Sequence, residues 1–206
     1  MKIIVFGATG NTGRRVLIQG IKMGHEMTAF VRNSEKLHDQ LGEHSAKHVK
    51  VIVDDMMDPV SVGEALAHQD AAIIAAGLLN IPYTDFIGNN LPGFPPEYKN
   101  HNRNFERLQR TGLDWSMMCP GTMIDSREHP EPVHLHVTTE TLPVPMPETI
   151  KEYSEADIAG HLFSRFQELN VAYDDVVMCM LDHLELEGAF KRKRVGLAYQ
   201  SNIPVR

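Results

Sequence analysis

Three glycines near the N-terminus have the spacing of a phosphate-binding turn. Gly7, Gly10 and Gly13 lie in the segment GATGNTG, directly after the apolar run Lys2–Phe6. In such a turn the first glycine permits a tight bend, the second lets the backbone approach a pyrophosphate, and the third lets the next helix pack against the sheet. Further side-chain donors come from Thr9, Asn11 and Thr12. The segment therefore predicts a dinucleotide site; a turn that serves packing alone is the alternative.

The end of the second expected strand bears on which dinucleotide is bound. NAD-binding proteins usually carry an acidic residue there for the ribose 2′-hydroxyl, whereas NADP-binding proteins carry arginine. Here the residue is Arg32, whose guanidinium can hold a 2′-phosphate through two hydrogen bonds and stack on adenine. Ser34 and Lys36 can reinforce that contact, while Glu35 counts slightly against it. The sequence thus favours NADP over NAD, with an ordinary surface arginine as the alternative.

Two further strand ends supply candidate cofactor contacts. Asp54 and Asp55 follow the third expected strand, where a carboxylate can accept a hydrogen bond from the adenine amino group. A solvated loop acid or a helix cap is an equal alternative at this position. Ala75, Ala76 and Gly77 end the fourth expected strand. Their small size leaves space for the nicotinamide ribose, although a tightly packed strand end would have the same composition.

Alternating strands and helices position these residues. The expected strands are Lys2–Phe6, Met27–Val31, Val49–Val53 and Ala71–Ala75, and the expected helices are Thr12–Met23, Leu37–Leu41 and Pro59–Ala67. Strands that alternate with helices indicate parallel pairing and right-handed crossovers. We therefore predict an α/β fold, a Rossmann-like doubly wound parallel sheet. It is expected to form a single domain over residues 1–206, with residues 1–77 as the cofactor-binding half.

The pattern changes after the fourth strand. Residues 78–100 hold four prolines, which leaves little room for a helix followed by a strand. Beyond this shortened segment we expect helices over Asn102–Thr111 and from Ser154 to about Glu168, and strands over Trp115–Cys119 and Val195–Tyr199. Five prolines between Pro130 and Pro147 predict an extended, loop-rich segment.

The composition restricts the partners. The chain has 206 residues, of which 42% are hydrophobic, and a formal net charge of −7. These values are typical of one globular domain and argue against nucleic acid as the main partner. Two cysteines, Cys119 and Cys179, imply no disulfide framework and favour a reducing compartment. Because no apolar run reaches membrane-spanning length, we expect a cytoplasmic protein with no membrane partner.

The motif GATGNTG, together with AFVRNSEKL, VIVDDM, DAAIIAAG and GLDWSMMCPG, resembles the NmrA-like families of atypical short-chain dehydrogenases. Within that group the chain is most similar to the NADPH-dependent flavin reductases, also called biliverdin IXβ reductases. The similarity covers residues 1–77, resumes over His101–Asp125 and includes Tyr153–Phe166, whereas the last forty residues match poorly. This resemblance implies hydride transfer from NADPH to a flavin or a linear tetrapyrrole.

The resemblance also implies which residues contact the cofactor. In that family the contacts come from the glycine turn, the arginine after strand two, the turn after strand three and the end of strand four. The corresponding positions here are Gly7–Gly13, Arg32 with Lys36, Asp55 with Met56, Ala75–Gly77, His101, Pro120 and Gly121. Thr122, which replaces a histidine of the vertebrate reductases, and Met123 are expected on the substrate side. By residue type alone, His101 is as readily an ordinary loop histidine.

Two features of that group of enzymes are missing. The resemblance implies a helix and a strand between Gly77 and His101, yet the proline-rich segment is too short for them, so the sheet is expected to lack one strand. Either Trp115–Cys119 pairs directly with the fourth strand, or the chain is a reduced and inactive relative of those enzymes. The Tyr–Lys pair of typical short-chain dehydrogenases is also absent, since the residue four positions after Tyr98 is Asn102.

These observations lead to one main interpretation and two alternatives. The main one is an NADPH-dependent reductase acting on a flavin-like or other flat conjugated small molecule. The first alternative is a regulatory protein that binds NADP without turning it over, and the second, a weaker one, is a sugar-nucleotide epimerase. We expect a monomer or weak homodimer. No metal is expected, because His134 and His136 lack a third ligand at a recognised spacing.

Overall fold

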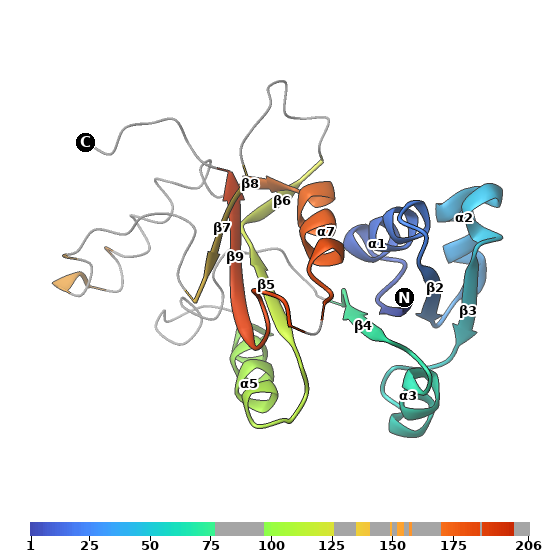
Figure 1. Cartoon of the computed structure of the whole chain (residues 1–206), viewed down its shortest axis with the longest axis horizontal. Helices are drawn as coiled ribbons and strands as arrows, with labels where there is room; N and C mark the ends of the chain where they lie inside the picture. The colour runs from blue at the N-terminus through green and yellow to red at the C-terminus, as the bar shows by residue number, and fades with distance from the viewer. Residues whose placement is uncertain are drawn as a thin grey trace. The chain divides into compact units, whose positions relative to one another are not determined.

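The structure of the chain is a computed structural model (Figure 1), which describes residues 1–76, 97–125, 135–140, 149, 152–154, 157, 170–185 and 187–199. Its contacts form two compact units. The first comprises residues 1–77 and 177–184, and the second comprises residues 78–176 and 185–206. The glycine-rich turn, Arg32 and the two aspartates Asp54 and Asp55 all lie in the first unit.

A four-stranded parallel sheet forms the centre of the first unit. Its strands are β1 (Lys2–Phe6), β2 (Glu26–Val31), β3 (Val49–Val53) and β4 (Ala71–Ile74), in the order β3-β2-β1-β4. The connecting helices are α1 (Asn11–Lys22), α2 (Ser34–Ala46) and α3 (Pro59–Leu66). The chain moves outward from β1 to β3 and then returns to the other side of β1. Ligands of such sheets bind at this reversal, beyond the carboxyl ends of the strands.

Helices cover both faces of this sheet, which explains why β1 is apolar almost throughout. Ile3 and Val5 pack against α1 and α2 on one face, while Ile4 and Phe6 pack with Ala65 of α3 on the other. All four strand residues are at most 4% exposed. A strand buried on both faces has no position for a polar side chain. The predicted α/β fold with a doubly wound parallel sheet is confirmed in this unit.

The predicted helix over Leu37–Leu41 is too short. The structure places α2 over Ser34–Ala46, and its backbone leaves the helical conformation at Gly42, where φ is 71° and ψ is 161°. Asn33 begins the helix, because its side chain accepts a hydrogen bond from the Lys36 N–H at 2.8 Å. The helix buries only a narrow apolar stripe, so hydrophobic periodicity shows its centre and not its ends.

A helix from the C-terminal quarter of the chain completes the core of the first unit. This helix, α7 (Tyr173–Asp182), contributes Val177 and Leu181, which are 0% and 4% exposed. It was not among the predicted elements. The expected helix from Ser154 to about Glu168 lies almost wholly outside the described residues. At its start, the Asp157 N–H donates to the Ser154 hydroxyl at 3.3 Å, as a capping pair requires.

The described residues of the second unit form two small sheets and a helix. The helix is α5 (Glu97–Gln109), and the strands are β5 (Ser116–Pro120), β6 (Thr122–Ile124), β7 (Leu135–Thr139), β8 (Asn170–Ala172) and β9 (Lys193–Tyr199). β9 pairs in parallel with β5 and antiparallel with β7, while β6 pairs in parallel with β8. The expected strands at β5 and β9 are confirmed. The loop-rich interpretation of residues 130–147 is wrong at β7. The prolines of this segment lie outside the strand, and the backbone groups of β7 pair with those of β9.

Basic residues near the C-terminus make contacts inside the second unit. Lys191 Nζ lies 3.3 Å from a carboxylate oxygen of Asp114. Arg194 pairs with Glu140 at 3.3 Å, and its guanidinium lies 4.5 Å from the centre of the Phe105 ring. Exposed ion pairs add little stability, but these contacts engage both basic groups. This part of the chain is therefore not an open cationic surface.

We expect Leu181→Ala to destabilise the protein by about 2–5 kcal/mol, because it leaves a cavity in the core that α7 completes. Leu113→Ala serves as the control, since Leu113 is 62% exposed and its truncation should change stability by less than about 0.5 kcal/mol. Urea unfolding followed by circular dichroism measures both values. Equal, small effects would contradict the assignment of α7 to this core.

Candidate functional site

The carboxyl ends of the four parallel strands bring the predicted cofactor residues to one edge of the first sheet. Phe6 of β1 pairs in register with Phe30 of β2 and with Ile74 of β4, and Val31 of β2 pairs with Val53 of β3. The residues that follow are the glycine turn after β1, Arg32 after β2, Asp54 and Asp55 after β3, and Ala75 and Ala76 after β4. The structure therefore brings together predicted contacts that are far apart in the sequence.

The turn after β1 has a shape that only glycine allows. Gly7 has a φ of 75°, and the Gly10 N–H donates to the Gly7 carbonyl at 3.0 Å. A Cβ on Gly7 would lie 2.8 Å from the carbonyl of Ala75 and from the nitrogen of Ala76. A Cβ on Gly13 would lie 2.8 Å from the Cα of Ala8. The turn thus holds the start of α1 close to the ends of β1 and β4.

The first turn of α1 has the features of an anion-binding site. Gly10 is its N-cap, with extended backbone and no side chain to accept a hydrogen bond from the helix N–H groups. No acidic residue lies in the first turn. Uncapped amides and the positive end of the helix dipole attract negative charge, so this arrangement suits a diphosphate. Beside it, Thr9 and Thr12 are half-buried and Asn11 is exposed.

Arg32 lies directly after β2 and is exposed. In the described parts of the chain, no residue engages its guanidinium. Ser34 and Lys36 follow it, both exposed, in the first turn of α2. The cap that Asn33 makes with the Lys36 N–H fixes where this helix starts and therefore where Arg32 stands. The pattern of an asparagine before Ser-Glu-Lys-Leu is an N-cap signal that the sequence analysis did not use.

The turn after β3 is held by its own aspartates. The Asp54 N–H donates to the Val31 carbonyl at 3.0 Å, which ties this turn to the end of β2. Hydrogen bonds from the Ser61 hydroxyl and the Asp55 N–H hold the pKa of Asp54 below its usual value. One carboxylate oxygen of Asp55 accepts the Met57 N–H at 3.0 Å. Asp55 therefore stabilises the turn itself. Met56, the other predicted contact here, is 43% exposed.

Asp58 is a further residue that shapes this edge and that the sequence analysis did not name. It is the N-cap of α3, and its carboxylate accepts the Val60 N–H at 3.0 Å. Pro59 occupies the first position of the helix, where its missing N–H costs nothing. The Asp-Pro pair before an apolar segment would have predicted this helix start.

The remaining predicted residues belong to the second unit or lie outside the described residues. Pro120 ends β5, and the Gly121 N–H donates to the Leu197 carbonyl of β9 at 2.8 Å. Thr122 and Met123 are half-buried in β6. In the described parts of the chain, the buried hydroxyl of Thr122 has no hydrogen-bond partner. His101 lies in α5, with its side chain outside what the structure describes, and Gly77 is also outside it.

The described residues contain no group of three or more histidine, cysteine or acidic side chains that could hold a metal ion. His134, one of the two histidines considered for such a role, is not among them. None of the described helices has both the length and the apolar character needed to cross a membrane.

Comparison with known proteins gives the same picture of the first unit. Residues 7–85 match the sequence model of a family described as NAD(P)H-binding. YwnB of Bacillus subtilis (strain 168), an uncharacterized protein, is 27% identical in an alignment 157 residues long that covers 61% of this chain and 74% of YwnB.

Solved structures share the fold over nearly the whole chain. A short-chain dehydrogenase/reductase of Veillonella parvula DSM 2008, in complex with NADP, is 14% identical, with a TM-score of 0.65 over 96% of this chain and 94% of that one. SP1627 of Streptococcus pneumoniae TIGR4, described as a candidate NADH-flavin reductase, is 19% identical, with a TM-score of 0.63 over 97% of this chain and all of SP1627. At these identities the likeness shows the Rossmann-type fold.

We expect Gly7→Ala to weaken binding of both NADPH and NADH by about tenfold or more. The new Cβ meets the backbone of Ala75 and Ala76, and a left-handed backbone costs a non-glycine residue roughly 1–2 kcal/mol. The control is Gly63→Ala in α3, where a Cβ would have nothing within 4 Å. Isothermal titration calorimetry compares the two variants. If Gly7→Ala binds like the control, the turn does not hold the cofactor.

Proposed function

We propose that the chain binds NADP(H) in preference to NAD(H). The observation that carries this proposal is Arg32, exposed and unengaged by the described residues, at the carboxyl end of β2 beside the uncapped start of α1. A guanidinium at this position can bind a 2′-phosphate with two hydrogen bonds. We propose that Ser34 and Lys36, in the first turn of α2, add to that contact. A carboxylate, which would select the free 2′-hydroxyl of NAD, does not stand there.

The proposed activity is reduction of a flavin or another flat conjugated acceptor. NADPH supplies the hydride, so the protein has to bind, orient and exclude water, and solvent can supply the proton that completes the reduction. The resemblance of the sequence to the flavin reductases and the description of SP1627 both support this class of acceptor. From the resemblance we propose His101, Pro120 and Gly121 as cofactor contacts, and Thr122 and Met123 as contacts of the acceptor.

A second candidate function is a sensor that binds NADP without reducing an acceptor. One observation favours it: between β4 and α5 the chain has 22 residues, Ala75 to Pro96, which is short for the helix and strand expected there. The Tyr–Lys pair of typical short-chain dehydrogenases is also absent. For either function we propose a cytoplasmic location, in keeping with the two free cysteines, Cys119 and Cys179.

We expect Arg32→Ala to weaken NADPH binding by about 10- to 100-fold and to leave NADH binding unchanged, because the lost hydrogen bonds involve a charge and reach only the 2′-phosphate. Arg110→Ala, which removes an exposed arginine of the second unit, should change neither affinity. Calorimetric titration gives the dissociation constants of both variants for both nucleotides. Dividing each by the value of the unmodified chain gives four ratios to compare. Equal losses for NADPH and NADH would contradict selection by Arg32.

Turnover separates the reductase from the sensor. We expect oxidation of NADPH, followed at 340 nm, to exceed the protein-free rate when FMN or biliverdin is added. Tight NADPH binding together with no turnover across flavins, tetrapyrroles, quinones and aldehydes would select the sensor and reject the reductase. A rate that Arg32→Ala reduces with NADPH, but not with NADH, would tie the turnover to this site.

A further inference from the structure

β3 is the outermost strand of the first sheet, next to β2 (Figure 1). In the described parts of the chain it pairs with β2 along one edge and with no strand along the other. Two of its apolar side chains are open to solvent, with Val51 40% and Val53 56% exposed. An open edge of this kind offers backbone donors and acceptors to another strand.

The edge carries little of the usual protection against pairing. Natural edge strands are blocked by proline, by a bulge, by lysine or another charged side chain, or by a covering helix or loop. β3 has the sequence VKVIV, and its register with β2 is continuous from Val49 to Val53. Lys50, its only charged residue, alternates with Val49 and Val51 and so lies on the opposite face. β3 itself places no charged side chain on the valine face, although Glu35 and Asp39 of α2 line the pocket beside it.

The segment around β3 is complementary to the same segment of a second copy that runs antiparallel to it. An antiparallel pair centred on Val51 sets Val51 opposite Val51 of the second copy, and Val49 opposite Val53. Beyond the strand the pairing does not continue, because Lys47 and His48 lie in the turn before β3 and Asp54 and Asp55 lie in the turn after it. The reversed arrangement brings the turn before β3 of each copy next to the turn after β3 of the other. Basic residues before the strand therefore meet acidic residues after it, on both sides of the two-fold axis. Parallel pairing in the same register would instead set like charges together.

The charges are available for such a contact. Lys47 pairs with Glu43 at 2.9 Å, but both side chains are more than 65% exposed, and a single exposed pair of this kind contributes little. Asp54 and Asp55 are exposed. Their local hydrogen bonds come from single N–H and O–H groups and leave other carboxylate lone pairs to accept from a lysine.

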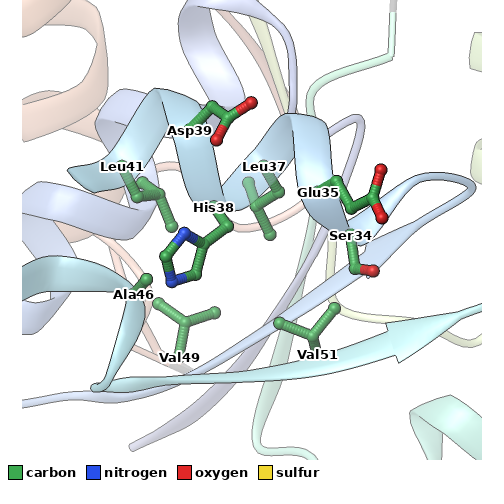
Figure 2. Close-up of a pocket in the computed structure, with 9 residues that line it drawn as sticks. All are labelled: Ser34, Glu35, Leu37, His38, Asp39, Leu41, Ala46, Val49 and Val51. Atoms are coloured by element: carbon green, nitrogen blue, oxygen red, sulfur yellow. The ribbon is translucent and has the colours of Figure 1, made fainter. Parts of the chain in front are cut away.

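A pocket beside the open edge can receive a valine side chain from a second copy of the chain. It has a volume of about 340 Å³ and lies between α2 and β3, with Val49 and Val51 forming its strand side (Figure 2). Leu37 and Leu41 of α2 line the opposite side, and His38 lies between the two elements. In the antiparallel register, Val53 of the second copy comes against Val49 at this pocket. The exposed valines of each copy are then covered by the other.

We propose that two copies of this chain associate through β3, with β3 pairing antiparallel to its counterpart about a two-fold axis at Val51. The occupant of the open edge is thus a second copy, in an isologous contact that joins two four-stranded sheets into one. The proposal depends on the edge, the exposed valines and the self-complementary charges. It does not depend on which cofactor the chain binds or which acceptor it reduces.

Sedimentation velocity of the full chain over a range of concentrations tests the association. We expect a reversible dimer, and we expect Val51→Lys to raise the dimer dissociation constant by about tenfold or more, because two lysines then face each other at the axis. Val60→Lys in α3 is the control, since Val60 is 67% exposed and lies outside the edge. Thermal melting of each variant shows that its fold is intact. A chain that stays monomeric at every concentration, or a dimer that Val51→Lys leaves unchanged, overturns the proposal.

A cysteine at position 51, on the proposed two-fold axis, tests the register in which the two β3 strands pair. Residues directly opposite in an antiparallel pair have Cβ atoms about 4.5–5.5 Å apart, near the range a disulfide spans. In a Cys119→Ser background, Val51→Cys should give a disulfide-linked dimer under mild oxidation, and Val60→Cys should not, although Val60 is more exposed. Equal cross-linking of the two variants would show random collision and would reject pairing at Val51.

Discussion

The structure of the first unit depends on one close approach between backbones. Gly7 comes so near to Ala75 and Ala76, and Gly13 so near to Ala8, that neither position has room for a Cβ. This approach sets the start of α1 against the ends of β1 and β4. It also leaves the first amides of α1 without a side-chain cap, at the point where the strand order reverses. The close backbone contacts of Gly7 and Gly13 therefore pack α1 against the sheet and also create the place where a diphosphate can bind.

Local donors explain how an acidic chain can hold an anionic cofactor. The net charge is −7, yet the edge of the sheet presents uncapped helix amides and the exposed guanidinium of Arg32. The basic residues near the C-terminus do not add to this edge. Lys191 and Arg194 are engaged by Asp114 and Glu140 within the second unit. Binding of the anion thus depends on a few positioned groups and not on the overall charge.

The sequence predicted the first unit well because its signals are local. A buried strand, a glycine turn and an amphipathic helix each fall within a dozen residues, and the strand ends then define the edge where the cofactor residues meet. What the sequence could not show is which distant segment completes the core. Val177 and Leu181 of α7 are buried against strands about a hundred or more residues earlier, and no short-range pattern carries that information. β7 was missed for a related reason, since its backbone is satisfied by β9, some sixty residues later. The caps at Asn33 and Asp58 were within reach of sequence reasoning, because both precede helices with a suitable first turn.

Calorimetric titration of the unmodified chain with NADPH and NADH tests the central claim most directly, because it measures the diphosphate site and the preference for the 2′-phosphate together. The account predicts one nucleotide per chain, with NADPH bound more tightly than NADH and a melting temperature that rises with nucleotide concentration as mass action requires. No heat of binding and an unchanged melting temperature with either nucleotide, at concentrations up to about 1 mM, where even a weak site would be occupied, would contradict it.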